Sequence, residues 1–182
     1  MSTTVLGAGA MFTLFTYVVP MLETMTGASP AFVTIALVII GVGFTIGNGL
    51  GGKLADWSLD GSLKLFLGAI VVMMLALPFL LTSYAGAAIG LLLWGVATFA
   101  VVPPVQIRVM QAASEAPGLA SSVNIGAFNL GNALGAAVGG VVISSGMDLP
   151  VVSYAGAALA ALGLVVVFIA SRTPVLVSQP AE

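Results

Sequence analysis

Apolar positions along this chain gather in long blocks, and polar positions gather between them. Six apolar blocks hold 17 to 25 residues each. An α-helix rises 1.5 Å per residue, so about 20 residues cross a hydrocarbon core that is ~30 Å thick. The pattern therefore predicts six transmembrane helices, at residues 3–22, 31–52, 65–81, 85–105, 120–144 and 150–170.

Polar side chains divide these segments into two kinds. Segments 65–81 and 150–170 consist mainly of large aliphatic residues, which can face lipid around much of a helix. The other four segments contain hydroxyl and amide groups, which are costly to expose to lipid. We expect those four helices to lie inside and the two aliphatic helices to lie outside.

Two motifs occur twice at nearly the same offset. Val-Val-Pro at residues 18–20 recurs 83 residues later at 101–103, and Gly-Asn-x-Leu-Gly at 47–51 recurs 84 residues later at 131–135. The chain therefore divides into two three-helix units. Because three is odd, the second unit crosses the membrane in the opposite sense, which predicts two inverted repeats, an architecture typical of transporters.

Glycines form a stripe on one segment of each unit. They recur at every fourth position: Gly43, Gly47, Gly51, Gly131, Gly135 and Gly139. Stripes of small residues let two helix backbones approach closely. We assign these six glycines to helix packing.

Composition agrees with this class of protein. Hydrophobic residues make up 60% of the chain and charged residues 5%, whereas soluble domains carry about 25% charged residues. A soluble fold of this size leaves about a third of its chain surface exposed and could not hide so much apolar surface. We predict an all-α membrane protein, a single six-helix bundle over residues 1–182.

The missing residue types limit the chemistry. The chain has no His and no Cys, which excludes disulfides, soft-metal sites and catalysis by a thiol or an imidazole. We expect no enzyme activity, no metal and no cofactor. The net charge of −2 is too small to imply a charged partner, and no nucleic acid is expected.

The basic residues indicate an orientation. All four fall in the gaps on one side of the predicted membrane: Lys53, Lys64, Arg108 and Arg172. The opposite gaps carry only Glu23 and Asp148. Cytoplasmic loops retain Lys and Arg, so both termini are expected in the cytoplasm. No charged side chain lies deep inside a segment, so a proton relay wholly within these residues is not expected.

Amide and aromatic side chains are the candidates for binding a substrate. The six are Phe12, Phe15, Tyr17, Asn124, Asn129 and Asn132. At about 100° per residue, the three asparagines fall within about 140° of one helix surface. They can bond a neighbouring helix or a polar solute in a cavity. The three aromatic residues can form the wall of a site or pack between helices.

A third candidate site follows the second segment. A glycine pair at 51–52 ends the helix with close backbone contact, and Asp56 comes one turn later. We assign Gly52, Lys53 and Asp56 to a gating loop, where Asp56 can accept N–H groups at a helix N-terminus or pair with a cation. Asp56 can equally be a solvated loop carboxylate, since exposed ion pairs contribute little.

Three separated stretches resemble one family. Residues 12–20, 47–56 and 124–135 look like the corresponding parts of the major facilitator superfamily, and in particular of the C-terminal half of bacterial drug:proton antiporters and arabinose or sugar efflux permeases. The resemblance implies helices seven to twelve of a twelve-helix transporter. Segments one, two, four and five would line the cavity. Gly52 and Asp56 match the family's loop motif, whereas Trp57 replaces its basic residue.

The resemblance also implies a function. We expect efflux of a small organic solute, drug-like or sugar-like, by alternating access in the bacterial inner membrane, coupled to protons. The expected partners are the solute, protons, the lipid bilayer and a missing N-terminal six-helix half. The alternatives are a second copy of this chain, as in a homodimeric transporter, and a nontransporting vestigial fragment or membrane assembly module.

Overall fold

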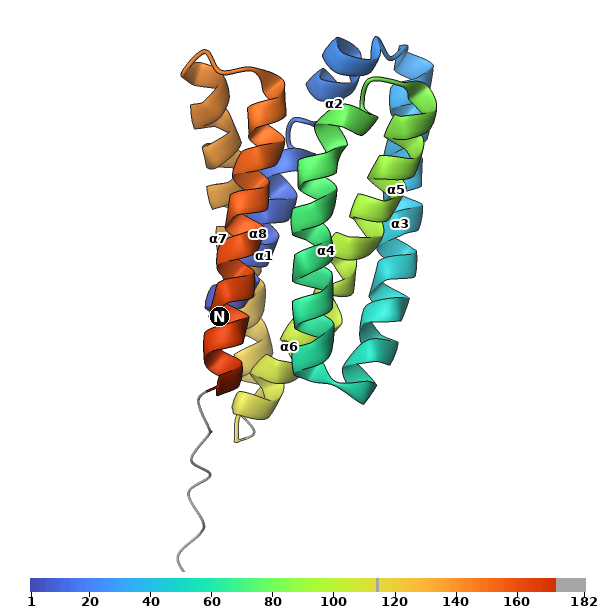
Figure 1. Cartoon of the computed structure of the whole chain (residues 1–182). Helices are drawn as coiled ribbons and strands as arrows, with labels where there is room; N and C mark the ends of the chain where they lie inside the picture. Colours follow the sequence, from blue (N-terminus) through green and yellow to red (C-terminus); the bar gives the residue numbers. More distant parts are fainter. Residues whose placement is uncertain (114, 173–182) are drawn as a thin grey trace, which may run out of the picture.

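The computed structural model describes residues 1–113 and 115–172, so the remaining positions of the predicted 1–182 bundle lie outside the described residues. The described residues form helices and no strand (Figure 1). The elements are α1 (Ser2–Phe15), α2 (Val18–Met21), the π-helical turn η1 (Leu22–Thr26), α3 (Pro30–Trp57), α4 (Leu59–Leu80), α5 (Tyr84–Ala100), α6 (Val102–Ala112), α7 (Pro117–Ser144) and α8 (Leu149–Arg172).

Up to six of these units are long and apolar enough to cross a membrane. Five are single spans, of which one joins α5 to α6 over Tyr84–Ala112. The sixth is a bent pair, Ser2–Phe15 with Val18–Thr26, whose two parts meet at 47°. The predicted class, an all-α membrane protein, is confirmed.

The packing of the helices follows the two repeats. The most extensive contacts join α1 to α7 and α3 to α5. In terms of spans, the first packs on the fifth and the second packs on the fourth. The repeat relation matches the first span with the fourth and the second with the fifth, so it converts the α1–α7 pair into the α5–α3 pair. The third and sixth spans, α4 and α8, pack on each other along the centre of the view in Figure 1. This exchange relation is the arrangement that inverted repeats require.

Both repeats are interrupted at their Val-Val-Pro motif. The first span breaks after Phe15 and resumes at Val18, and the fourth breaks at Val101 and resumes at Val102. Proline has no N–H, so Pro20 and Pro103 each leave the carbonyl four residues earlier without its helical donor. The repeated motif therefore places a break in the same position of each unit.

The six striped glycines lie at the two main helix seams. A Cβ atom on Gly43 would lie 2.7 Å from the Leu92 carbonyl oxygen, and one on Gly131 would lie 2.5 Å from that of Val5. The other four glycines meet the backbone of Val96, Ala100 and Gly9 and the ring of Tyr17 in the same way. Only a residue without a Cβ allows the α3–α5 and α1–α7 backbones to lie this close.

The glycine pair at 51–52 does not end its helix. Neither glycine has a positive φ, and α3 continues to Trp57. The helix stops where Ser58, in an extended conformation, begins α4 and its Oγ accepts a hydrogen bond from the Gly61 N–H at 3.0 Å. The residues assigned to a gating loop, Gly52, Lys53 and Asp56, are therefore helical, and that loop assignment is corrected.

In this chain taken alone, α3 and α7, which were expected to lie inside, are less buried than α4 and α8, which were expected to lie outside. The most hydropathic windows of α3 and α7 are 22% buried, against 39% for α4 and α8. In α4, a stripe that includes Leu63, Leu67 and Met74 is fully buried. The helices α3 and α7 bury their glycine stripe and leave the opposite face open. They are therefore the outer helices of this bundle unless another protein surface covers them.

The seam geometry predicts a difference between two neighbouring glycines of α3. Gly47→Ala should lower the free energy of unfolding by about 1–3 kcal/mol, because its Cβ would overlap the Val96 carbonyl. Gly49→Ala, which meets nothing within 4 Å, should cause no loss. Reversible unfolding in mixed detergent micelles measures both. Equal stability of the two variants would contradict the seam.

Candidate functional site

Five phenylalanine rings form a continuous row across four helices, which we call the aromatic row. Its members in spatial order are Phe128 on α7, Phe12 and Phe15 on α1, Phe44 on α3 and Phe99 on α5. Successive ring centroids lie 6.5, 5.7, 6.0 and 4.0 Å apart. The first two contacts are edge-to-face and the last is stacked, which are the geometries that the ring quadrupole favours.

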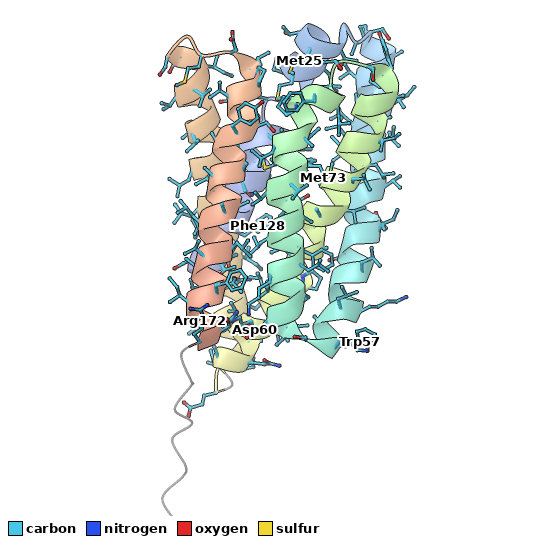
Figure 2. The ribbon with its side chains drawn as sticks, in the orientation of Figure 1. Met25, Trp57, Asp60, Met73, Phe128 and Arg172 are labelled. Carbon is cyan, nitrogen blue, oxygen red and sulfur yellow. The ribbon has the colours of Figure 1, made fainter. Side chains whose placement is uncertain are left out.

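The aromatic row lies near the middle of its spans. Phe44 is next to the midpoint of α3, and the other four rings lie within three residues of the midpoints of their spans. At 1.5 Å per residue this is a displacement of less than about 5 Å along the helix. Figure 2 labels Phe128 well inside the bundle rather than at either end. All five rings are partly exposed, so the row is a surface at mid-depth.

A buried tryptophan, Trp94, packs against the aromatic row on the side that faces the bundle interior. The Trp94 ring centroid lies 6.1 Å from that of Phe44, and Trp94 has no exposed surface. Its indole Nε1 has no hydrogen-bond partner among the described residues. Because Gly43 and Gly95 meet at the same level of the α3–α5 seam, the indole and Phe44 are fixed by close backbone packing.

The three predicted aromatic residues divide between two roles. Phe12 and Phe15 belong to the aromatic row. Tyr17 does not, because its hydroxyl donates to the Ala136 carbonyl at 2.9 Å and its ring covers Gly139. Sequence reasoning missed Phe44, Phe99 and Phe128. The available signal was their position, near the middle of segments that also carry polar groups.

The three asparagines do not face one another. Asn124 is 6% exposed. Its Oδ1 accepts from Thr4 Oγ1 of α1 at 2.7 Å, and its Nδ2 donates to Gln106 Oε1 of α6 at 2.7 Å. Gln106 Nε2 in turn lies 2.7 Å from Ser121 Oγ. We call these four side chains the polar network. It joins three helices, so Asn124 is an interhelical group.

The other two asparagines lie closer to the surface. Asn129 is exposed and Asn132 is half-buried. The Asn132 Oδ1 is inaccessible to solvent and has no hydrogen-bond partner among the described residues. The Asn129 amide, rather than that of Asn124, is therefore the one that a solute or an opposing helix can reach, while the Asn132 oxygen is enclosed.

A small cavity adjoins the aromatic row on its basic side. It has a volume of about 30 Å³, and its lining includes Thr4, Thr98, Val101, Val105, Asn124 and Phe128. This is room for about one water molecule, whereas drug-sized ligands occupy about 300–1,000 Å³. The aromatic row is therefore one wall of a site rather than a closed pocket.

The residues of the predicted gate lie at the basic end of the bundle. Figure 2 shows Trp57, Asp60 and Arg172 at this end and Met25 at the other. Gly52 has open space beside it, while Lys53 and Asp56 are exposed. The ion pair here joins Arg108 Nη1 to Asp60 Oδ1 at 2.9 Å, so Asp60 and not Asp56 ties two helices together.

Curated membrane transport proteins align with most of this chain. No family model matches it. It is 64% identical over 170 residues to the inner membrane transport protein YdhP of Escherichia coli strain K12, an alignment that covers 93% of this chain and 44% of that protein. It is 35% identical over 146 residues to the uncharacterized MFS-type transporter YtbD of Bacillus subtilis strain 168, with 78% and 37% covered.

A third relative gives the same result. The uncharacterized MFS-type transporter YfhI of Bacillus subtilis strain 168 is 29% identical over 162 residues, with 89% of this chain and 41% of that protein covered. The chain spans less than half the length of each of these relatives. It belongs to the major facilitator superfamily and corresponds to the C-terminal half of its transporters, as the resemblance implied.

The polar network predicts unequal roles for two asparagines of α7. Asn124→Ala should lower the free energy of unfolding by about 1–2 kcal/mol, because it leaves the Thr4 hydroxyl and the Gln106 Oε1 without their partner. Asn129→Ala should change it by less than about 0.5 kcal/mol, because that side chain is exposed. Detergent unfolding of both variants tests this, and equal losses would be the contrary result.

Proposed function

We propose that this chain is one half of a transporter that exports a small organic solute across the bacterial inner membrane by alternating access. Two relatives are named as MFS-type transporters and one as an inner membrane transport protein. The observation that carries the proposal is the aromatic row, a partly exposed surface built from four helices at mid-depth. Solute sites of such transporters lie near the bilayer midplane, between repeats.

The aromatic row sets the kind of solute. Phenyl rings offer apolar surface, and Asn129, the exposed amide next to Phe128 in the sequence, carries no charge. A solute that contacts this wall therefore needs an apolar or aromatic face and one or two polar groups. Drug-like and sugar-like molecules both meet this description. The wall carries no charged side chain, and only the faces of its rings can attract a cation on the solute.

A second protein surface is needed to complete the site. The outward faces of α3 and α7 are apolar, with Val38 and Leu130 exposed, yet each also exposes an amide, Asn48 and Asn129. An amide facing lipid costs several kcal/mol when it stays unpaired. These faces therefore favour a protein partner over lipid. We propose an N-terminal six-helix half as that partner, with a second copy of the chain as the alternative.

Coupling to protons is assigned to the opposing half. Among the described residues, the charged side chains lie at the two ends of the bundle, with Lys53, Lys64 and Arg108 at one end and Glu23 and Asp148 at the other. A group that couples a proton gradient must titrate within the membrane, close to the solute path. The proton-binding carboxylates of the complete transporter would therefore come from the half that faces this one.

The basic end is proposed to face the cytoplasm. Because the chain has no cysteine, a single introduced cysteine reports its own position. Trp57→Cys, at a site 94% exposed, should be protected from an impermeant thiol reagent in intact cells and labelled after permeabilisation. Met147→Cys, 46% exposed at the other end, should be labelled in intact cells. The opposite pattern would reverse the orientation.

Export should require both the opposing half and the aromatic row. In proteoliposomes with an imposed pH gradient, this chain alone should not move solute, because one wall cannot enclose a cavity. The chain joined to an N-terminal half should do so. In that protein, Phe44→Ala should lower export about 3- to 10-fold, since an aromatic contact contributes about 0.5–1.5 kcal/mol.

The matched control is a phenylalanine outside the site. Phe79→Ala, on α4 and 72% exposed, should leave export unchanged at equal protein levels. A panel of drugs and sugars identifies the solute. Gradient-driven export by this chain alone would favour the homodimeric transporter. Failure of export with every solute, although the joined protein folds, would favour a nontransporting membrane module.

A further inference from the structure

An open groove runs along the outer surface of α4, in the half of the helix next to the basic end. It has a volume of about 490 Å³, and its lining consists of Lys64, Leu65, Gly68, Ala69, Val72 and Met73. Gly68 and Ala69 lie between larger side chains, and a Cβ atom on Gly68 would meet nothing within 4 Å. The two small residues therefore leave a depression in a helix face that is otherwise bulky.

The groove has about the length of one membrane leaflet. It begins at Lys64 and ends at Met73, which at 1.5 Å per residue is a distance of about 13 Å. Half of a hydrocarbon core that is ~30 Å thick is about 15 Å. Figure 2 shows Met73 well inside the bundle and Arg172 at the basic end. An acyl chain in the groove would therefore extend from the level of Lys64 to the middle of the membrane.

This face of α4 is suited to lipid rather than to another protein. After Lys64 the helix contains no hydroxyl, amide or charged side chain, and Leu65 and Val72 are exposed. The outward faces of α3 and α7 differ, because each exposes an amide, Asn48 and Asn129. The outer face of α4 can contact hydrocarbon without leaving any side-chain polar group unpaired.

Two cations lie at the basic end of the groove. The Lys64 Nζ lies 5.0 Å from the centroid of the Phe168 ring on α8, and α8 packs against α4 (Figure 1). Arg172 follows Phe168 by four residues, so both project from the same face of α8. A ring contacts an ammonium group from one side. The other N–H groups of Lys64 can therefore donate to an anion.

These two cations have no carboxylate partner among the described residues. Asp60 precedes Lys64 by one turn of α4, but its Oδ1 pairs with Arg108 Nη1 at 2.9 Å, and this is the one ion pair in the part of the chain that the structure describes. Lys64 and Arg172 therefore leave positive charge beside an apolar groove. Basic sites of this kind, at the ends of membrane helices, attract the headgroups of anionic lipids.

We propose that the outer face of α4 and α8 binds one anionic phospholipid from the leaflet at the basic end. The lipid phosphate contacts Lys64 and Arg172, and one acyl chain lies in the groove over Gly68. This site is separate from the aromatic row and needs no opposing half, so its test depends neither on solute export nor on the identity of the solute.

Lipid titration followed by native mass spectrometry tests the role of the charges. The chain in detergent micelles should bind its first phosphatidylglycerol at least about fivefold more tightly than phosphatidylcholine with the same acyl chains, a factor expected from one basic residue near the headgroup. Lys64→Gln combined with Arg172→Gln should reduce this preference to less than about twofold. Lys53→Gln removes an exposed cation from α3 at the same end and should leave the preference unchanged.

A substitution of equal charge tests the groove itself. Gly68→Leu fills the depression and should weaken phosphatidylglycerol binding at least about threefold, because the acyl chain loses buried contact. The matched control, Gly49→Leu on α3, also replaces a glycine with nothing within 4 Å and should have no effect. Circular dichroism verifies that each variant is folded. Equal affinity of the unmodified chain for the two lipids, a preference that survives the double substitution, or unchanged binding by Gly68→Leu would overturn the proposal.

Discussion

The close approach of helix backbones at the two glycine seams is the constraint on which the rest of this structure depends. Along α1 and α7, and along α3 and α5, atoms of one helix lie where a Cβ atom of the other would be. Each seam joins a helix of one repeat to a helix of the other. The repeats are therefore held by backbone contact, which fixes both the separation and the rotation of four helices.

That rotation decides which side chains stay available to a partner. Phe44 follows Gly43 of one seam, and Phe128 precedes Gly131 of the other by three residues. Both rings therefore emerge at the edge of a seam, partly exposed, where they meet the aromatic residues of α5 and α1. The same rotation turns Asn48 and Asn129 away from the bundle. The seams thus produce an aromatic surface and two unburied amides together.

Much of this arrangement could be predicted from sequence, because it depends on local patterns. Apolar blocks and repeated motifs predicted the class of fold and its two repeats, whereas the helix breaks near residues 16 and 101 were not predicted. The aromatic row could not be found in the same way, because Phe44 in a membrane helix has the same local pattern whether it packs or lines a site. The three asparagines share one arc, and only the positions of Thr4 and Gln106 on other helices separate buried Asn124 from exposed Asn129.

The two ends of the bundle are closed by different kinds of bond, although the repeats share one architecture. At the acidic end, Thr26 Oγ1 donates to the Leu81 carbonyl at 2.6 Å and Tyr84 Oη to the Gly27 carbonyl at 2.9 Å. Those acceptors are backbone carbonyl groups, and their positions change only when the backbone conformation changes. At the basic end, the polar network joins side chains to side chains, so each bond needs two correct rotamers. A bond of the second kind is lost when either of two side chains changes its rotamer, whereas a bond of the first kind depends on only one side-chain rotamer. The basic end is therefore the end that this fold can release at smaller structural cost.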